Sequence, residues 1–186
     1  MKRLLFLSVL TFCNLAFLNA QRFFSKDVHV NFSATASDSP EKIEASNPKA
    51  VCVIDDNSGA IELAVLVKSF HFERALMEEH FNENYMESLK FPKATFVGVV
   101  SDIKSVNLLK DGNYNVKVSG KLTLHGITKD VTTNAVVSVA NGALSNAKAS
   151  FSIKLSDFSI DIPGAVKDKV ASDAKIEINT ALALYK

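Results

Sequence analysis

The sequence of 186 residues predicts an all-β fold that carries one amphipathic helix. Glycine, proline, asparagine and aspartate mark turns at regular intervals, and the runs between them are short and rich in Val, Ile, Leu, Thr and Phe. Turn signals at this spacing are typical of β-sandwiches and β-barrels. The marks lie at residues 37–41, 55–59, 111–113, 126, 141–142 and 163–164. Between these turns most runs alternate like strands, and a single segment has helical periodicity. These observations predict the fold class.

Several of the runs alternate between apolar and polar side chains, as a strand with one buried face does. The clearest run, 106–124, is expected to form a hairpin that turns at Asp111-Gly112, because this pair tolerates the positive φ angles of a tight turn. From 114 to 124 the even positions are apolar or glycine and the odd positions are polar. Segments 151–155 and 175–184 alternate in the same way. About eight such strands can close into a barrel whose interior is filled by side chains or holds a small ligand.

One segment, residues 73–90, has helical periodicity instead. Apolar side chains recur at every fourth position from Met77 to Leu89, which places them on one face of a helix of about four turns. Pro92 disfavours helical geometry at the residue before it, so we expect the helix to end there. Such a helix in an all-β chain is expected to lie over a sheet or across the mouth of a barrel.

Residues 1–20 have the pattern of a secretory signal peptide. Lys2 and Arg3 precede an apolar run, which is too short for a transmembrane helix, and the segment ends at Asn19-Ala20. We therefore expect export to the periplasm or the exterior, with residues 21–186 as one domain. Removal of the two basic residues leaves this domain close to neutral, which argues against nucleic acid as a partner. Cys52 is then the only cysteine, and its apolar neighbours indicate a buried strand residue.

The aromatic composition indicates how the interior could be used. The chain contains 13 Phe and no Trp, and several of the Phe residues flank the expected helix. Met77 and Met86 add flexible side chains that suit an adaptable apolar site. Regularly spaced aromatic residues also build ordinary cores, so the pattern alone leaves both a ligand wall and a solid core open.

Four segments resemble the YceI-like family: SFHF (69–72), LMEEHFNENYMES (76–88), FPKATFVG (91–98) and VSGKLTLHGITKDVT (118–132). The resemblance extends over essentially the whole of residues 21–186. It implies an extended antiparallel β-barrel of lipocalin-like shape, exported from the cytoplasm. It also implies a tunnel that holds an isoprenoid or another long amphiphilic chain.

The residues that could carry catalysis form no recognisable constellation. His71 and His80 are nine positions apart, unlike the two histidines of an HExxH zinc motif, and His125 lies at a strand end, where a turn or surface role is expected. There is no nucleophile elbow and no glycine-rich phosphate loop. We therefore expect no catalytic residue, no metal site and no cofactor.

Together these patterns predict a non-enzymatic carrier or sequestering protein for a polyisoprenoid, an isoprenoid quinone or a fatty chain, compatible with transient membrane contact and with a homodimer. The polar contact is expected at His80. A solid-core interaction protein and a lipid-modifying enzyme are the alternatives. The expected ligand-binding residues are Phe70, Phe72, Met77, His80, Phe81, Tyr85, Met86, Phe91 and Phe96.

Overall fold

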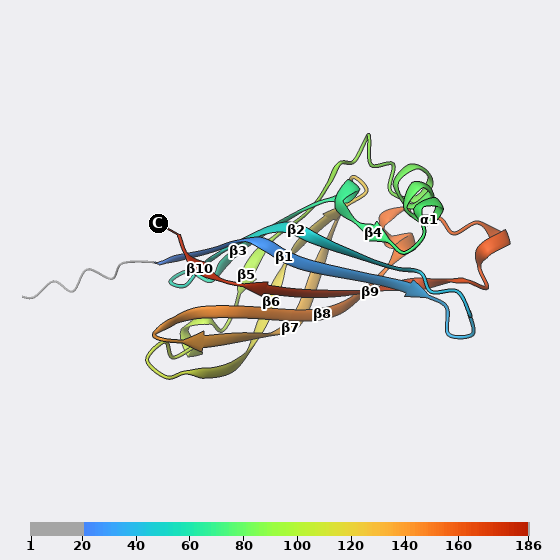
Figure 1. Ribbon diagram of the computed structural model, residues 1–186. Helices are drawn as coiled ribbons and strands as arrows, with labels where there is room; N and C mark the ends of the chain where they lie inside the picture. The colour runs from blue at the N-terminus through green and yellow to red at the C-terminus, as the bar shows by residue number, and fades with distance from the viewer. Residues whose placement is uncertain (1–20, 186) are drawn as a thin grey trace, which may run out of the picture.

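The computed structural model describes residues 21–185, so the expected signal peptide lies outside the described part. Eight long antiparallel strands form a barrel, which the pairing of β1 with β2 closes (Figure 1). Their order around the barrel is β1-β9-β8-β7-β6-β5-β3-β2. The long strands are β1 (Arg22–Thr35), β2 (Glu44–Asp55), β3 (Ala60–Leu66), β5 (Lys93–Val100), β6 (Gly112–Leu124), β7 (Ile127–Ala140), β8 (Ala143–Lys154) and β9 (Val170–Ala181). Short strands β4 (His71–Phe72) and β10 (Ala183–Leu184) pair with β2 and β1.

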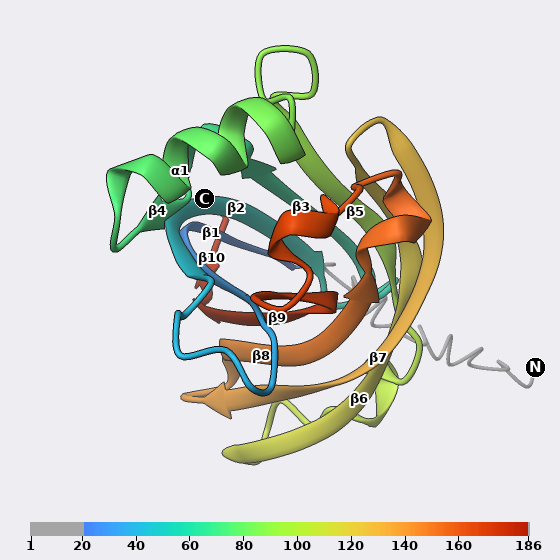
Figure 2. The same cartoon turned by 90° about the vertical axis from the view of Figure 1, so that its right-hand side faces the viewer.

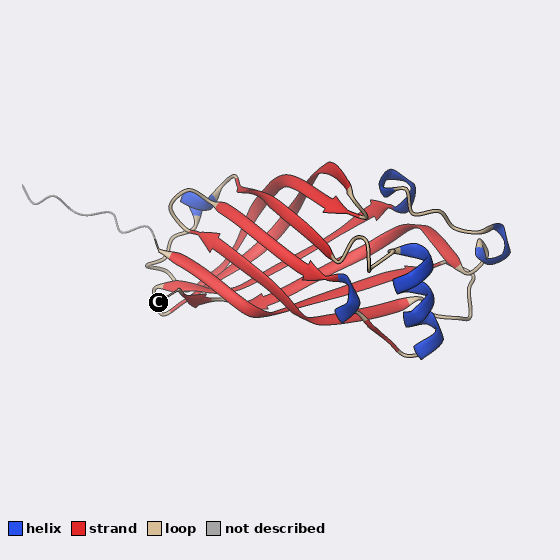
Figure 3. Cartoon of the chain, turned by 90° about the horizontal axis from the view of Figure 1, so that it is seen from above, coloured by secondary structure: helices blue, strands red, loops and turns tan. Residues whose placement is uncertain are grey.

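The two ends of the barrel differ. At one end, the mouth, lie helix α1 (Ala75–His80) and the turns η4 (Leu155–Phe158) and η5 (Gly164–Val166), as the view along the barrel shows (Figure 2). A view from above places almost all the helical turns at this end (Figure 3). The expected fold, a barrel of about eight antiparallel strands with one helix near its mouth, is confirmed.

Tight turns join several neighbouring strands where the sequence marks them. His125 and Gly126, between β6 and β7, have φ values of 50° and 76°, and Asn141 and Gly142, between β7 and β8, have 54° and 77°. Two successive positive φ values bend the backbone in the sense that matches the twist of the flanking strands. Between β2 and β3, backbone N–H groups of Asn57 and Ser58 donate to the Asp55 carboxylate.

The helix is shorter than the sequence predicts. α1 spans only Ala75–His80, and the single wide turn η2 (Phe81–Tyr85) follows it. In this turn the Met86 N–H donates to the Phe81 carbonyl oxygen at 2.9 Å, so the hydrogen bond spans five residues instead of the four of an α-helix. The buried face therefore continues from Phe81 to Met86. Leu89, expected on that face, lies beyond the helix and is 86% exposed.

The hairpin expected at 106–124 does not form. Only its second strand, β6, is present, and it pairs with β5 and β7. Residues 106–111 form turns instead, in which Leu109 is 95% exposed. Val106 is buried next to the turn η3 (Ile103–Ser105), and the Asp111 carboxylate accepts a hydrogen bond from the N–H of Asn141 at 3.0 Å. Val106 is thus buried without being part of a strand, and Asp111 caps the backbone of Asn141 and does not form a hairpin turn.

The end of the barrel opposite the mouth is filled by side chains. Inward-facing residues near that end of four strands, together with Leu182 and Ile103, are buried and belong to one cluster. The strand residues are Phe23, Val116, Val139 and Leu144, and Leu182 directly follows β9. The barrel is therefore closed at this end, and any interior space can open only toward the mouth.

Candidate functional site

The interior of the barrel holds an apolar cavity of about 170 Å³, here called the tunnel. All eight long strands contribute to its wall, through residues such as Val30, Ile54, Phe96 and Ile178. These side chains point inward because alternate residues of a strand face the same side. Near the closed end, Val118, Val137 and Thr180 still line the tunnel. The next inward-facing residues toward that end, Val116, Val139 and Leu182, do not line it. It is a blind tunnel.

A second cavity of about 260 Å³, here called the mouth cavity, lies between the helix and the segments opposite it. Met77, His80, Phe81 and Tyr85 line it from the helical side. Ile43, Leu155, Ile160, Val166 and Val170 line it from the other segments. Its walls are mainly apolar, but charged side chains lie at its rim. The only charged residue on the tunnel wall, among those that the structure describes, is the exposed Lys148.

The two cavities meet at a neck. Phe32, Phe81, Met86, Leu155 and Ile160 line both. The Phe81 ring is the centre of an aromatic cluster, with centroids 5.0 Å from Phe72, 5.6 Å from Phe70 and 5.8 Å from Phe32. Edge-on and tilted contacts at these distances are favourable for aromatic rings. Phe81 thus stands where a molecule entering the tunnel from the mouth has to pass.

The volumes indicate how a ligand would lie. Small-molecule sites usually have volumes of roughly 300–1,000 Å³. The tunnel, at about 170 Å³, and the mouth cavity, at about 260 Å³, reach this range only together. A ligand of ordinary size would therefore extend from the mouth through the neck into the tunnel, with its apolar part inside.

Two polar side chains expected at the site lie at the mouth. Nδ1 of His80 accepts a hydrogen bond from the Asn84 side-chain N–H, with 3.1 Å between the nitrogens. The neutral ring then has its proton on Nε2, which is available as a donor. Tyr85 presents an aromatic ring with a hydroxyl group to the same cavity. Both residues suit contact with the polar end of a ligand.

His125 lies in the turn between β6 and β7, as the sequence predicts, but it is not a surface histidine, since its side chain is only 11% exposed. Its Nε2 lies 2.9 Å from the Glu87 carboxylate and its Nδ1 lies 3.0 Å from the Phe158 carbonyl oxygen. Its ring also packs edge-on against Phe91, with 4.7 Å between centroids. His125 therefore ties together three segments that surround the mouth.

The structure places eight of the nine expected ligand-binding residues on the two cavities. Phe70 and Phe96 line the tunnel, and Phe81 and Met86 line both cavities. Phe72, Met77, His80 and Tyr85 line the mouth cavity. Phe91 lines neither, because it packs on His125 and over Gly126.

Sequence reasoning missed other wall residues. Val28, Val30 and Phe32 are apolar residues at alternate positions, as on one face of a strand, and this pattern would have identified Phe32 as inward-facing. Leu155 ends the alternating segment 151–155, which indicates an inward-facing side chain, whereas no sequence pattern indicated Ile160, which lies just beyond η4. The charged residues at the rim, Glu41, Arg74 and Lys169, also gave no signal, because they come from three segments far apart in the chain.

The remaining reactive side chains are not assembled for chemistry. Cys52 lines the tunnel, and its burial raises the pKa of the thiol to about 12, which disfavours the nucleophilic thiolate. His29 and His71 are exposed. Within residues 21–185, no three His, Cys, Asp or Glu side chains converge as metal ligands would.

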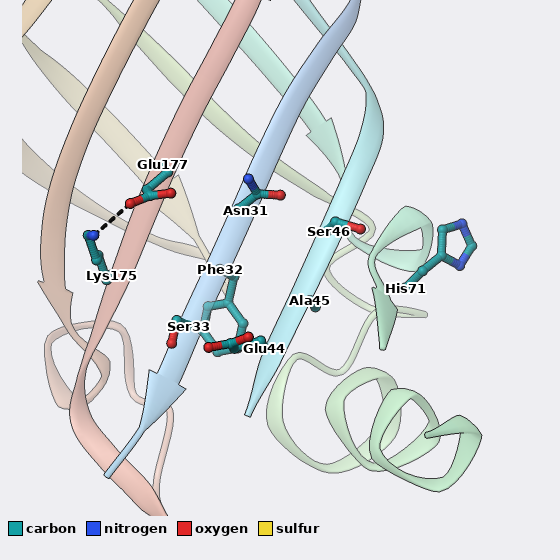
Figure 4. A pocket seen from close by; sticks show the side chains of 9 residues that line it. All are labelled: Asn31, Phe32, Ser33, Glu44, Ala45, Ser46, His71, Lys175 and Glu177. Carbon is teal, nitrogen blue, oxygen red and sulfur yellow. Dashed lines mark ion pairs between the residues drawn. The ribbon is translucent and has the colours of Figure 1, made fainter. Parts of the chain in front are cut away.

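The outer surface has larger but polar hollows. One, of about 500 Å³, lies over β1, β2 and β9, where Asn31, Ser33, Glu44 and Ser46 point outward and Lys175 pairs with Glu177 at 2.6 Å (Figure 4). A hydrocarbon chain would lose little contact with water in such an open polar groove. The interior is therefore the candidate site for an apolar ligand.

In the described part of the chain, none of the helices has the length and apolarity needed to cross a membrane.

Comparisons by sequence give a consistent family match. The family model described as a YceI-like domain matches residues 14–182. A UPF0312 protein of Pseudomonas putida is 31% identical over 115 residues, which are 59% of this chain and 55% of that protein. A UPF0312 protein of Vibrio parahaemolyticus is 29% identical over 119 residues, with shares of 61% and 58%. The chain thus matches little more than half the length of these curated relatives.

Solved structures share the fold at low identity. A polyisoprenoid binding domain from Saccharophagus degradans, implicated in plant cell wall breakdown, has a TM-score of 0.73 and 13% identity, covering 89% of this chain and 99% of that one. BcnA of Burkholderia cenocepacia has a TM-score of 0.67 and 21% identity, covering 84% and 96%. At these identities the similarity shows the fold alone.

Proposed function

Since the chain belongs to the YceI-like family, we propose that it is an exported carrier or sequestering protein that binds a long apolar or amphiphilic molecule inside its barrel. The single observation that carries this proposal is the blind apolar tunnel, which opens through an amphipathic mouth. An isoprenoid or a fatty chain fits the chemistry of such a wall. The polyisoprenoid binding domain of similar fold supports the same class of ligand.

The energetics favour a long chain. Each methylene group transferred from water to an apolar interior contributes roughly 0.8 kcal/mol. Loss of translational and rotational freedom on binding costs on the order of 4–15 kcal/mol. Short chains would therefore bind weakly, and tight binding requires a chain that fills the tunnel and the mouth cavity together.

The two alternatives receive less support. A solid-core interaction protein would not need an apolar cavity that reaches from the mouth toward the middle of the barrel. A lipid-modifying enzyme would need a nucleophile or an acid–base pair inside, whereas the tunnel wall offers the buried, protonated thiol of Cys52. The signal-peptide pattern of residues 1–20 supports export.

Two neighbouring residues of β8 provide a matched test. Ala149 lines the tunnel, whereas Ser150 is exposed on the outer face. The Ala149→Phe ring should fill the tunnel, and the Ser150→Phe ring adds the same apolar group outside. Native mass spectrometry with 1-hexadecanol should show a one-to-one complex for the wild type and Ser150→Phe, and a much smaller bound fraction for folded Ala149→Phe. Equal binding by all three proteins, or binding by none, would contradict the proposal.

A further inference from the structure

A chain of ion pairs crosses the rim of the mouth cavity. The carboxylate of Glu41, in the β1–β2 loop, contacts the guanidinium of Arg74, the residue before α1. The other oxygen of the same carboxylate lies 3.2 Å from Nζ of Lys169, the residue before β9. All three residues line the mouth cavity. Three separate segments thus bring one anion and two cations to the entrance.

The charges at this entrance do not balance. Among residues 21–185, Glu41 is the only carboxylate that lines the mouth cavity, and it pairs with both Arg74 and Lys169. The nearby carboxylate of Glu78 does not line it, because it accepts the Phe72 N–H at 3.1 Å and lies 3.6 Å from Nδ1 of His71. Glu73 does not line the mouth cavity either; it lines an adjoining outer hollow that shares Glu41, Arg74 and Met77 with it. The mouth cavity therefore has one positive charge in excess.

The tunnel beyond the neck has the opposite character. Its wall is built almost entirely from aliphatic and aromatic side chains, so a charged group placed there would lose its hydration without gaining a partner. A ligand with one charged end would keep that end at the mouth and place its chain in the tunnel. This orientation also brings the free donor Nε2 of His80 within the same cavity as the charged end.

We propose that Arg74 and Lys169 form a head-group site for an anionic amphiphile, whose carboxylate or phosphate stays at the mouth while its chain enters the tunnel. This inference rests on the proposed function and names the ligand class. Glu41 holds the two cations over the entrance when no ligand is bound, and it competes with the ligand's anion for them. Arginine and lysine are suited to this role, since both donate charge-assisted hydrogen bonds to carboxylate and phosphate oxygens.

The expected effect is moderate because the site is partly solvated. The side chains of Arg74 and Lys169 are 66% and 47% exposed, whereas that of Glu41 is 23% exposed. Water and salt weaken interactions between exposed charges. We therefore expect the two cations to favour an anionic head group over a neutral one by about three- to tenfold in affinity at low salt.

The test compares ligands with the same chain and different head groups. Dissociation constants of palmitate, hexadecyl phosphate and 1-hexadecanol are measured by displacement of a fluorescent apolar probe. The wild type should bind the two anions three- to tenfold more tightly than the alcohol, with a smaller difference at high salt. A preference for the phosphate assigns the site to phosphate head groups, and a preference for palmitate assigns it to carboxylates.

Variants at the rim separate the head-group site from the tunnel. Arg74→Gln and Lys169→Gln should each reduce the preference for the two anions over the alcohol, whereas Glu41→Gln should increase this preference. Lys167→Gln is the control, because Lys167 is exposed and lines neither cavity. Equal affinity of the wild type for alcohol and anions would overturn the head-group site but not the tunnel. Failure to bind any of the three ligands would overturn the proposed function itself.

Discussion

The imidazole of His125 and the carboxylate of Glu87 lie 2.9 Å apart, although 38 residues separate them in the chain. Glu87 follows the helical segment that lines the mouth cavity, and His125 lies in the turn between β6 and β7. Through its second nitrogen, His125 also contacts the carbonyl oxygen of Phe158 in η4. The position of the helical segment at the mouth therefore depends on a side chain that belongs to the barrel.

Replacement of His125 by alanine should release this connection. We expect His125→Ala to lower the free energy of unfolding by about 1–3 kcal/mol, because it leaves the carbonyl oxygen of the buried Phe158 without this partner and removes the ring that packs on Phe91. Amide hydrogen exchange in residues 86–91 should become faster, while β7 and β8 should change less. Urea denaturation and hydrogen exchange measure the two effects. His29→Ala, at an exposed position, is the control, and equal effects of the two variants would contradict the role of His125.

Gly120 permits a close approach of β5 and β6. A Cβ atom at this position would lie 2.5 Å from the Cα of Gly98 and from the Val97 carbonyl oxygen, and 2.7 Å from the Phe96 ring. We expect Gly120→Ala to destabilise the protein by about 1–3 kcal/mol and to push Phe96 into the tunnel. Gly164→Ala has open space around it and should be neutral. Thermal unfolding of both variants checks this, and equal stability would show that the strands can separate freely.

Asn47 is a polar side chain that is buried beside the strand irregularity of β2. Its amide N–H donates to the Leu66 carbonyl oxygen at 2.8 Å, and its side-chain oxygen accepts the Lys49 N–H at 3.0 Å. Asn47→Ala should cost about 1–3 kcal/mol of stability, since both backbone groups lose a partner. Asn115→Ala, on the exposed face of β6, should cost less than about 0.5 kcal/mol. A similar small cost for both would contradict this role.

The buried thiol of Cys52 should make stability depend on pH in the alkaline range. Burial raises its pKa from 9.0 to about 12, so between these values the unfolded chain loses the proton and the folded chain keeps it. Because the unfolded state then binds fewer protons, stability falls as pH rises above 9. At pH 10 this loss should be about 1 kcal/mol relative to neutral pH. Cys52→Ala lacks the thiol, so parallel pH curves for the two proteins would contradict the prediction.

The barrel was predictable because its signals are local. Alternation along 114–124 and 175–184 requires only that one face of each strand be buried, and that requirement holds in the structure as far as Leu182, whereas Leu184 is exposed. The turns at Gly126 and Asn141-Gly142 depend on backbone angles that few residues adopt. These features do not depend on which distant segment lies alongside.

The errors arose where tertiary contacts override local pattern. Apolar residues spaced four apart predict an uninterrupted helix, but the wide turn at Phe81–Tyr85 shifts the buried face to Met86 and leaves Leu89 in solvent. Asp111-Gly112 has the composition of a hairpin turn, yet Asp111 instead caps the backbone of Asn141. The cation pair at the mouth could not be found from spacing, because closure of the barrel alone brings its members together.

The affinity for uncharged alcohols of increasing chain length tests most directly whether a long chain occupies the tunnel. If it does, binding should strengthen by roughly 0.8 kcal/mol for each added methylene. The gain should stop when the chain reaches the blind end, and Ala149→Phe should move this limit to shorter chains. Affinity that does not depend on chain length, or a limit that is the same in Ala149→Phe, would contradict binding inside the barrel.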